Sequence, residues 1–565
     1  MMLAMALGHV QAQDATEYFD GNAYNVLLSA KGNHFWDYNQ MRMYVPSAPG
    51  DTTGPGTIFT STLWIGGIDQ AGQLHLAAER FLQTGRDFDA GPFAEVYDST
   101  DAQYNRLWKI NKSELSQWLV DPAAQIPPQV VQDWPGNGRN FSPYNESAYL
   151  APFVDTDNDG QYNPTNGFDY PKMRGDQSVY FMFNDNKSLN TESGGAQMGI
   201  EVRGMAYGFN CPEDSALNQT LFMHYEITNR SGNDYDEVYL GLWNDFDIGN
   251  SQDDFIGCDP LRNLFFGYNA DDFDEDQNGI TGYGDNVAAQ GVKILSGIFM
   301  DNDGADNQPG VEQGEYVNGF GFDDGIVDNE KIGLSYFVQS GAIVGPTTEP
   351  AIAVDYYNQM IGNGVFGPIT HPSNGQPTRF MFPGNSDTLF FGTYGDTVAP
   401  WSMGDSVSGG LAGDQRALGS MGPFSMPPNK TISFDIAYVF AQSEAGSMVA
   451  VQKMKNYADN IQELFDSGMT PCGAFEPEFA LGVENITAEN VWKLYPNPTT
   501  GLVTITSSNN AAFKTQIFNA QGELVANFAS SNTTQKVDLS NLSRGVYFVK
   551  TASERFSQTQ KLILQ

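Results

Sequence analysis

The segment DTDNDGQYNPTN (155–166) holds the clearest arrangement of residues that could perform chemistry. Asp155, Asp157 and Asp159 stand at alternate positions, and Gly160 lets the chain turn after them. Calcium prefers several oxygen ligands that converge in one short loop, and alternating carboxylates before a glycine supply them. The predicted calcium ligands of this loop are Asp155, Asp157, Asp159, Gln161 and Asp169.

The loop departs from an EF-hand at one position. Asn166 stands where an EF-hand has a bidentate glutamate. The departure favours an isolated structural calcium loop, similar to those of thrombospondin type-3 or dockerin modules, which Asp169 would complete. The alternative is an acidic surface turn that binds no metal.

Two weaker acidic loops follow further along the chain. Carboxylates this close repel one another, and either a cation or water must relieve the repulsion. Each loop is therefore a candidate cation site or a solvated acidic turn. The candidate ligands are Asp272, Asp274 and Asp276 in the first loop, and Asp301, Asp303 and Asp306 in the second.

Signatures of catalysis are largely missing. The five histidines are isolated in sequence, so no HExxH zinc helix exists, and no GxSxG segment occurs. Ser406 in GDSVSGG lies in a glycine-rich stretch that indicates a turn. Paired carboxylates for glycoside hydrolysis depend on a spatial separation that the sequence does not give.

Three cysteines are too few for a disulfide framework. We expect a bridge between Cys211 and Cys258 in an oxidising compartment, with two buried thiols as the alternative. Seven tryptophans stand beside Gly, Asp and Asn, where they could stack on sugar rings or belong to the core. They are Trp36, Trp64, Trp108, Trp118, Trp134, Trp243 and Trp401.

The elements that must position these residues are mainly β-strands. The chain of 565 residues contains 60 glycines and 29 prolines, which favours short strands and many turns. We predict a multi-domain β-sandwich body and a small C-terminal immunoglobulin-like β-sandwich. One amphipathic helix is expected near 444–467, because apolar residues recur there at a spacing of three and four before Gly468.

Composition divides the chain into expected regions. Residues 1–13 resemble the remnant of a signal peptide, and 470–490 lack periodicity, as a linker does. The expected folded regions are an N-terminal β region (14–150), an acidic β-rich body (151–469) and a C-terminal domain (491–565).

Charge separates the last region from the rest. The net charge of the chain is −40, but residues 491–565 carry seven basic and three acidic side chains, a net charge of +4. The remainder therefore carries −44. Nucleic acid and anionic membranes would repel such a body, and divalent cations would be attracted. No apolar run approaches the roughly 18 residues of a transmembrane segment.

The tail begins with a break in strand character. Pro496 and Pro498 fix φ and offer no ladder hydrogen bonds, and Gly501 permits the turn before the strand that follows. The segments of interest are LYPNPTTG (494–501), IFNAQGELV (517–525), VDLSNLSRGVYFVK (537–550) and KLILQ (561–565).

These segments closely resemble the type A C-terminal sorting domain of the type IX secretion system of Bacteroidota. The resemblance implies export through the periplasm, contact with the type IX secretion machinery, and cleavage near the linker. The body would then be attached to surface lipopolysaccharide or released. The residues that carry the motif are Tyr495, Pro496, Asn497, Pro498, Gly501, Gly545 and Tyr547.

The body is similar, over most of 20–480, to large secreted proteins of Bacteroidota that carry the same tail. The similarity rests on segments such as LWIGGIDQAGQLHLAAERF (63–81) and brings no activity with it. Our leading hypothesis is a calcium-stabilised surface or secreted protein without enzymatic activity that acts in adhesion, matrix or glycan binding. The alternative is a secreted hydrolase of polysaccharide or protein.

Overall fold

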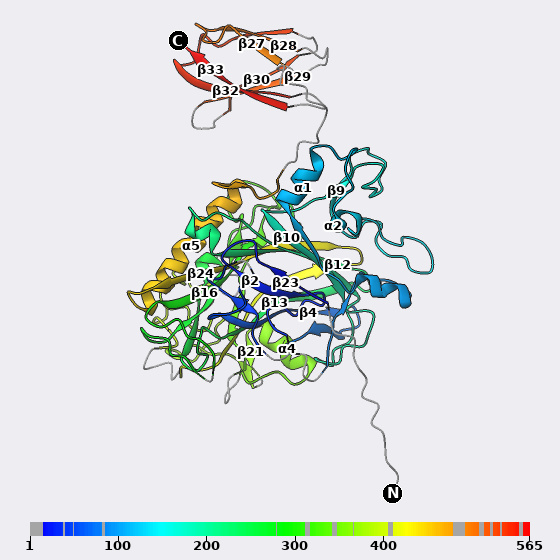
Figure 1. Cartoon of the computed structure of the whole chain (residues 1–565). Coiled ribbons are helices and arrows are strands. Elements are labelled where there is room, and N and C mark those ends of the chain that lie inside the picture. The colour runs from blue at the N-terminus through cyan, green and yellow to red at the C-terminus, as the bar shows by residue number, and fades with distance from the viewer. Residues whose placement is uncertain are drawn as a thin grey trace. The chain divides into compact units, whose positions relative to one another are not determined.

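A computed structural model provides the structure of the protein (Figure 1). It describes residues 15–37, 40–48, 50–81, 85–277, 279–310, 317–341, 347–364, 366–404, 411–477, 492–507, 513–519, 524–530, 534–552 and 557–565. The chain forms two compact units, Met1–Ala480 and Leu481–Gln565, which are called the body and the tail below.

The body is built on two antiparallel sheets. In spatial order, the nine-stranded sheet contains β14 (Asp254–Asp259), β15 (Leu264–Asn269), β16 (Val287–Ser296), β24 (Thr431–Ser443), β12 (Thr220–Asn229), β11 (Ile200–Gly208) and β10 (Gln177–Asn184), with β6 (Asp89–Ala90) and β7 (Trp108–Asn111) both paired to β10. The five-stranded sheet contains β20 (Tyr336–Gln339), β23 (Gln415–Met426), β13 (Tyr235–Phe246), β4 (Ile58–Asp69) and β5 (Leu74–Ala78).

The two sheets pack face to face and bury the main core between them. Phe265 of β15 meets Phe246 of β13 and Phe337 of β20, with ring centroids 6.3 and 5.6 Å apart. A buried hydrogen bond joins Ser61 of β4 to Tyr438 of β24 at 2.8 Å. The architecture is a β-sandwich, and the predicted mainly-β class is confirmed.

Helix α5 (Ser447–Ser467) covers the outer face of the nine-stranded sheet along β24 and β16 (Figure 1). Its buried side chains include Val451, Met454, Ala458 and Ile461, as the periodicity predicts. The helix ends at Gly468, whose φ of 68° is left-handed. It begins three residues later than expected.

Shorter elements complete the body. The helices are α1 (Lys112–Leu119), α2 (Gln129–Gln132), α3 (Ser215–Asn218) and α4 (Ala353–Met360), with 3₁₀ turns at Ser99–Tyr104 and Pro260–Arg262. The small sheets are β1 (Thr16–Phe19) with β2 (Asn25–Ser29) and β3 (Met43–Tyr44); β17 (Ile298–Phe299) with β19 (Lys331–Ile332) and β18 (Gly319–Phe320); and the pairs β8 (Phe153–Val154) with β9 (Tyr170–Pro171), β21 (Asn363–Gly364) with β22 (Gly367–Pro368), and β25 (Met469–Thr470) with β26 (Gly473–Ala474).

Two of the expected boundaries are corrected. The division near residue 150 does not separate folding units, because β4 lies beside β13 in the five-stranded sheet and β7 pairs with β10. Residues 470–477 also belong to the body, where Phe475 is buried. The proposed signal peptide remnant (1–13) and the rest of the linker (478–490) lie outside the described residues.

The tail is a second, smaller sandwich. One sheet contains β27 (Trp492–Tyr495), β28 (Leu502–Ser507) and β31 (Thr534–Asp538), and the other contains β30 (Leu524–Ser530), β29 (Phe513–Phe518), β32 (Gly545–Ala552) and β33 (Ser557–Leu564). Pro496 and Pro498 lie between β27 and β28, so the first strand precedes the proline break instead of following it.

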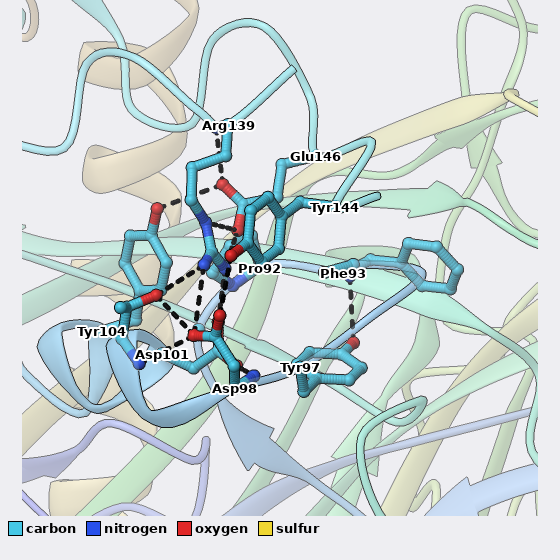
Figure 2. Close-up of polar contacts among 12 residues, drawn as sticks. Pro92, Phe93, Tyr97, Asp98, Asp101, Tyr104, Arg139, Tyr144 and Glu146 are labelled. Atoms are coloured by element: carbon cyan, nitrogen blue, oxygen red, sulfur yellow. Dashed lines mark hydrogen bonds and ion pairs between the residues drawn. The ribbon is translucent and has the colours of Figure 1, made fainter. Parts of the chain in front are cut away.

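Arg139, Asp101 and Glu146 form a buried ion cluster (Figure 2). It holds the loops around Trp108 and Trp134, which cover the part of the nine-stranded sheet's outer face that α5 leaves open. Arg139 bonds Asp101 and Glu146, which are 4% and 0% exposed at their side chains. The Tyr144 ring lies 3.9 Å from the guanidinium carbon. Tyr104 donates to Glu146 at 3.1 Å and also packs in a small core with Trp108 and Trp134.

We expect Arg139→Met to lower the free energy of unfolding by about 3–5 kcal/mol, because it leaves two buried carboxylates without a cation. Arg106→Met is the matched control. Its ion pair with Asp133 is 42% and 31% exposed, so the loss should be at most about 1 kcal/mol. Denaturant unfolding measures both, and equal small losses would show that the cluster contributes little.

Candidate functional site

The loop 155–169 brings together part of the predicted calcium ligand set. One carboxylate oxygen from each of Asp155, Asp157 and Asp169 lies within 4.8 Å of the others. Asp159 is outside this group and accepts hydrogen bonds from the Gln161 amide at 2.7 Å and from Asn163 at 2.9 Å. Gln161 is exposed and donates its side-chain amide to the Gly160 carbonyl.

Two oxygens of this loop are buried without a hydrogen bond from the described residues, Oδ1 of Asp155 and Oδ1 of Asn163. A Cβ added at Gly167 would lie 2.1 Å from Asn163 Oδ1 and 2.8 Å from Asp157 Oδ2. These two oxygens therefore lie on either side of the space that the glycine leaves empty. Partial desolvation, together with the charges of Asp159, Asp169 and Asp155, raises the pKa of Asp157, although this residue is exposed. The three convergent carboxylates are suited to calcium, and Asn163, whose Oδ1 lies beside Asp157, is a ligand candidate that the sequence pattern did not indicate.

The other two acidic loops use their carboxylates differently. Asp274 accepts from the backbone of Asn250 and Tyr283, and Asp272 accepts from the Ser447 amide at the start of α5. Asp276 accepts from Gly282, and Asp301 pairs with Lys430 at 2.6 Å. Asp303 and Asp306 accept from nearby amides. Among the described residues, neither loop gathers three carboxylates at one point.

The predicted disulfide is wrong. Cys211 pairs with Cys472, and their Cα atoms are 5.8 Å apart. Cys258 is a buried free cysteine. The reason is topological, because Cys258 belongs to the core between the two sheets, whereas Cys211 packs on the outer face with α5. The bridge ties the turn after α5 to the end of β11.

The seven tryptophans that could have stacked on sugars are all buried, with exposures between 0% and 7%. They are core residues. Trp64 and Trp243, for example, stack with centroids 6.0 Å apart, and Tyr356 of α4 packs on Trp64. A carbohydrate surface made from these rings is therefore excluded.

An open cleft of about 720 Å³ in the body offers room for a ligand. Five separate segments line it: the β1–β2 turn, the residues after β3, the start of α1, the entry to β10, and the stretch from the loop after β11 to the end of α3. Its lining is dominated by amide and hydroxyl side chains, among them Asn22, Asn111, Ser113, Gln177, Asn210 and Asn218.

The charged groups of this cleft are already paired. Asp20 bonds Lys109 at 2.5 Å, and Asp176 bonds Lys112 at 3.0 Å. Gln177 donates to Asp20 and to Asn111, which fixes the cleft floor. Asn210 and Ser113 are exposed at the rim. Sequence reasoning missed the cleft because its residues come from five separate places in the sequence, at 20–23, 47, 111–116, 176–177 and 210–218.

A smaller pocket of about 110 Å³ lies on the outer face of the nine-stranded sheet. His224 of β12 stands there with Nδ1 2.9 Å from Asp435 of β24, its direct cross-strand partner. Its Nε2 is 4.0 Å from Glu226. Arg174 and Lys172 reach the pocket through ion pairs with Glu476, which follows the disulfide.

The pKa of His224 is raised. Burial alone would lower it, but the hydrogen bond with Asp435 and the nearby carboxylate of Glu226 outweigh both burial and the charge of Arg174. The same histidine lowers the pKa of Glu226, against the opposing effect of burial. The pocket therefore holds a histidine that is charged at a higher pH than usual, in contact with two carboxylates.

The residues of the sorting motif join the first and last strands of the tail sandwich. Asn497 donates to the Lys561 carbonyl at 2.6 Å and accepts from the Ile563 amide at 3.0 Å, so the motif binds the last strand. Tyr547 is buried and donates to the Ser543 carbonyl. A Cβ at Gly501, where φ is 145°, would lie 2.9 Å from Ser540, so the site requires glycine. Tyr495 remains 50% exposed.

Comparison with protein families identifies this unit. Residues 493–565 match the family described as "Secretion system C-terminal sorting domain". The tail is thus a type IX sorting domain, and the protein is secreted or held at the cell surface. Its interaction with the type IX machinery follows from the same match. None of the described helices is long and apolar enough to cross a membrane.

Comparisons with whole proteins are less informative. No curated protein matches the chain. Among solved structures, PorZ, a surface component of the type IX secretion system of Porphyromonas gingivalis, shares 22% identity over 17% of this chain and 14% of its own, with a TM-score of 0.13. A polysaccharide lyase shares 8% identity over 64% of this chain and 34% of its own, with a TM-score of 0.17. The BSP domain of a biofilm-associated protein shares 9% identity over 69% of this chain and 59% of its own, with a TM-score of 0.12.

We expect His224 to make stability depend on pH. A histidine whose folded pKa is raised stabilises the fold fully below its unfolded pKa, near 6.5, and loses that contribution as the pH rises through the folded pKa. As the pH rises from the unfolded pKa through the folded pKa of His224, the free energy of unfolding of the wild type should therefore fall relative to that of His224→Gln. Denaturant unfolding across this range tests it, and parallel pH profiles would contradict the assignment.

Proposed function

We propose that this secreted β-sandwich protein binds hydroxyl-rich ligands, most simply glycans, and acts in adhesion or matrix formation outside the cell. The observation that carries the proposal is the open polar cleft. Its exposed amides and hydroxyls offer both donors and acceptors, as sugar hydroxyls require. Attachment to surface lipopolysaccharide after removal of the tail is the anchoring that we expect for a surface form.

The chemistry of the cleft favours binding over hydrolysis. Its two carboxylates, Asp20 and Asp176, are each neutralised by a lysine. A glycosidase needs one carboxylic acid that holds its proton and a second that is free to act as nucleophile or base. An ion pair with lysine favours the charged carboxylate, so neither aspartate would hold its proton as a general acid. The same ion pair keeps each carboxylate from acting as a free nucleophile or base.

Calcium is proposed as a structural ion in the loop 155–169. Asp155, Asp157, Asn163 and Asp169 would be its protein ligands. The two buried oxygens without hydrogen bonds support this role, because an unpaired buried oxygen is costly unless a cation or water satisfies it. The loop also positions Tyr162, which packs in the core beneath the Arg139 cluster.

The cleft is tested by truncating two rim groups. Asn210→Ala with Ser113→Ala removes hydrogen-bonding groups from exposed side chains without disturbing the core. At about 0.5–1.5 kcal/mol for each of the two lost hydrogen bonds, we expect affinity for a bound glycan to fall by roughly 5- to 150-fold. The full chain is screened on an array of neutral and acidic glycans, and the positive glycan is titrated by calorimetry.

The matched control is Asn456→Ala, an exposed amide on α5 away from the cleft lining. It should leave the affinity unchanged. If the full chain binds no glycan of the array, or if the double variant binds as tightly as the wild type, the proposed function is wrong.

Calcium should raise the melting temperature of the full chain. At a concentration about 100 times its dissociation constant, one ion bound only to the folded state adds roughly 2.7 kcal/mol. Asp157→Asn should remove most of the increment that belongs to this loop, whereas Asp303→Asn, in a loop without a convergent ligand group, should remove little. Identical unfolding curves in calcium and in chelator would exclude the site.

A secreted hydrolase remains the second candidate, and the His224 pocket is the observation that favours it. A histidine 2.9 Å from a buried aspartate is the arrangement of a general base with an orienting carboxylate. Loss of a measured hydrolytic activity in His224→Gln, with glycan affinity intact, would establish this function beside binding.

A further inference from the structure

Three carboxylates meet at one end of the five-stranded sheet. Asp245 and Asp247 lie at and just beyond the end of β13, two residues apart, so they share a face of the strand. Phe246 pairs with Gln415 of β23, which places Asp414 opposite Asp247. One oxygen from each of the three aspartates lies within 4.8 Å of the others. Like charges directly opposite one another destabilise a sheet.

A second observation points to a missing ligand at this position. Asp245 is 3% exposed, and its Oδ1 accepts no hydrogen bond among the described residues. Asp254 of β14 is outside this group of three but interacts with the charge of Asp247, and its Oδ2 accepts from the Ile248 amide at 2.8 Å. The other oxygen of Asp254 is also buried and unpaired within the described structure, and the residue is 0% exposed. A buried carboxylate oxygen without a donor is unfavourable.

The nearby basic side chain does not balance this charge. Arg416 lies with Nε 3.4 Å from Asp245 Oδ1 and donates to Asp414 at 2.8 Å. The same guanidinium is also 3.7 Å from Glu349 and interacts with the charge of Asp247. Arg80 also binds Glu349, at 2.8 Å, so Arg416 is left to face the three aspartates, and its Nε makes no hydrogen bond to any described residue.

We propose that Asp245, Asp247 and Asp414 bind a divalent cation, with calcium as the expected ion. All the ligand atoms are carboxylate oxygens, which hard cations prefer. At calcium–oxygen distances of about 2.3–2.6 Å, two ligands on opposite sides of the ion lie about 4.6–5.2 Å apart, so oxygens within 4.8 Å can share one ion. The ion would hold the end of β13 against the start of β23. This inference is independent of the glycan proposal.

The test separates this site from the loop 155–169. Asp157→Asn in the full chain, freed of metal with chelator, serves as the background, and calcium is titrated by calorimetry. Adding Asp414→Asn should lower the stoichiometry by one ion. Asp414 is suitable because it is exposed. In thermal unfolding, calcium at about 100 times its dissociation constant should shift the folding equilibrium of the background about 100-fold more than that of the double variant.

Asp396→Asn in the same background is the matched control, since Asp396 is also exposed and the charge change is the same. It should keep the stoichiometry. Circular dichroism verifies that each variant is folded, and Asp247→Asn provides a second removal of a ligand. If Asp414→Asn and Asp247→Asn both retain the stoichiometry and the calcium-dependent shift of the background, the proposed site does not exist.

Discussion

The packing of the nine-stranded sheet against the five-stranded sheet is the constraint on which the rest of the body depends. It requires close approach at two glycines, because a Cβ at Gly419 would lie 2.5 Å from Phe265 and one at Gly267 would lie 2.6 Å from Phe246. The strands involved come from both ends of the body sequence, from β4 to β24. Burial of their shared apolar faces thus makes residues far apart in sequence neighbours, and the candidate sites that combine distant segments follow from that arrangement.

The outer face of the nine-stranded sheet is covered in two parts. Helix α5 covers one part, and the segment held by Arg139 and Glu146 covers the other. His224 lines the pocket on this same face and is bonded to Asp435 of the neighbouring strand. The disulfide of Cys472 fixes the residues just before Glu476, whose ion pairs with Lys172 and Arg174 form one wall of the pocket.

An excess of acidic residues is accommodated in three ways. The chain has 68 acidic and 28 basic side chains, so most carboxylates cannot have a basic partner. Some accept backbone hydrogen bonds, as Asp274 does, and a few are paired with an arginine in a buried cluster. Two groups of carboxylates are not fully neutralised by either backbone hydrogen bonds or basic side chains. They are Asp155, Asp157 and Asp169, and Asp245, Asp247 and Asp414. These groups are where a cation would stabilise the fold most.

The sequence by itself determined the mainly-β class, helix α5 and the sorting tail, because strand alternation, helical periodicity and the tail motifs are local patterns. It also indicated the loop 155–169, whose main ligands lie within fifteen residues. Tertiary structure alone decided the disulfide partner of Cys211, since the nine-stranded sheet separates it from Cys258. The polar cleft and the Asp245 cluster were decided in the same way, because each combines segments that only sheet pairing and packing bring together.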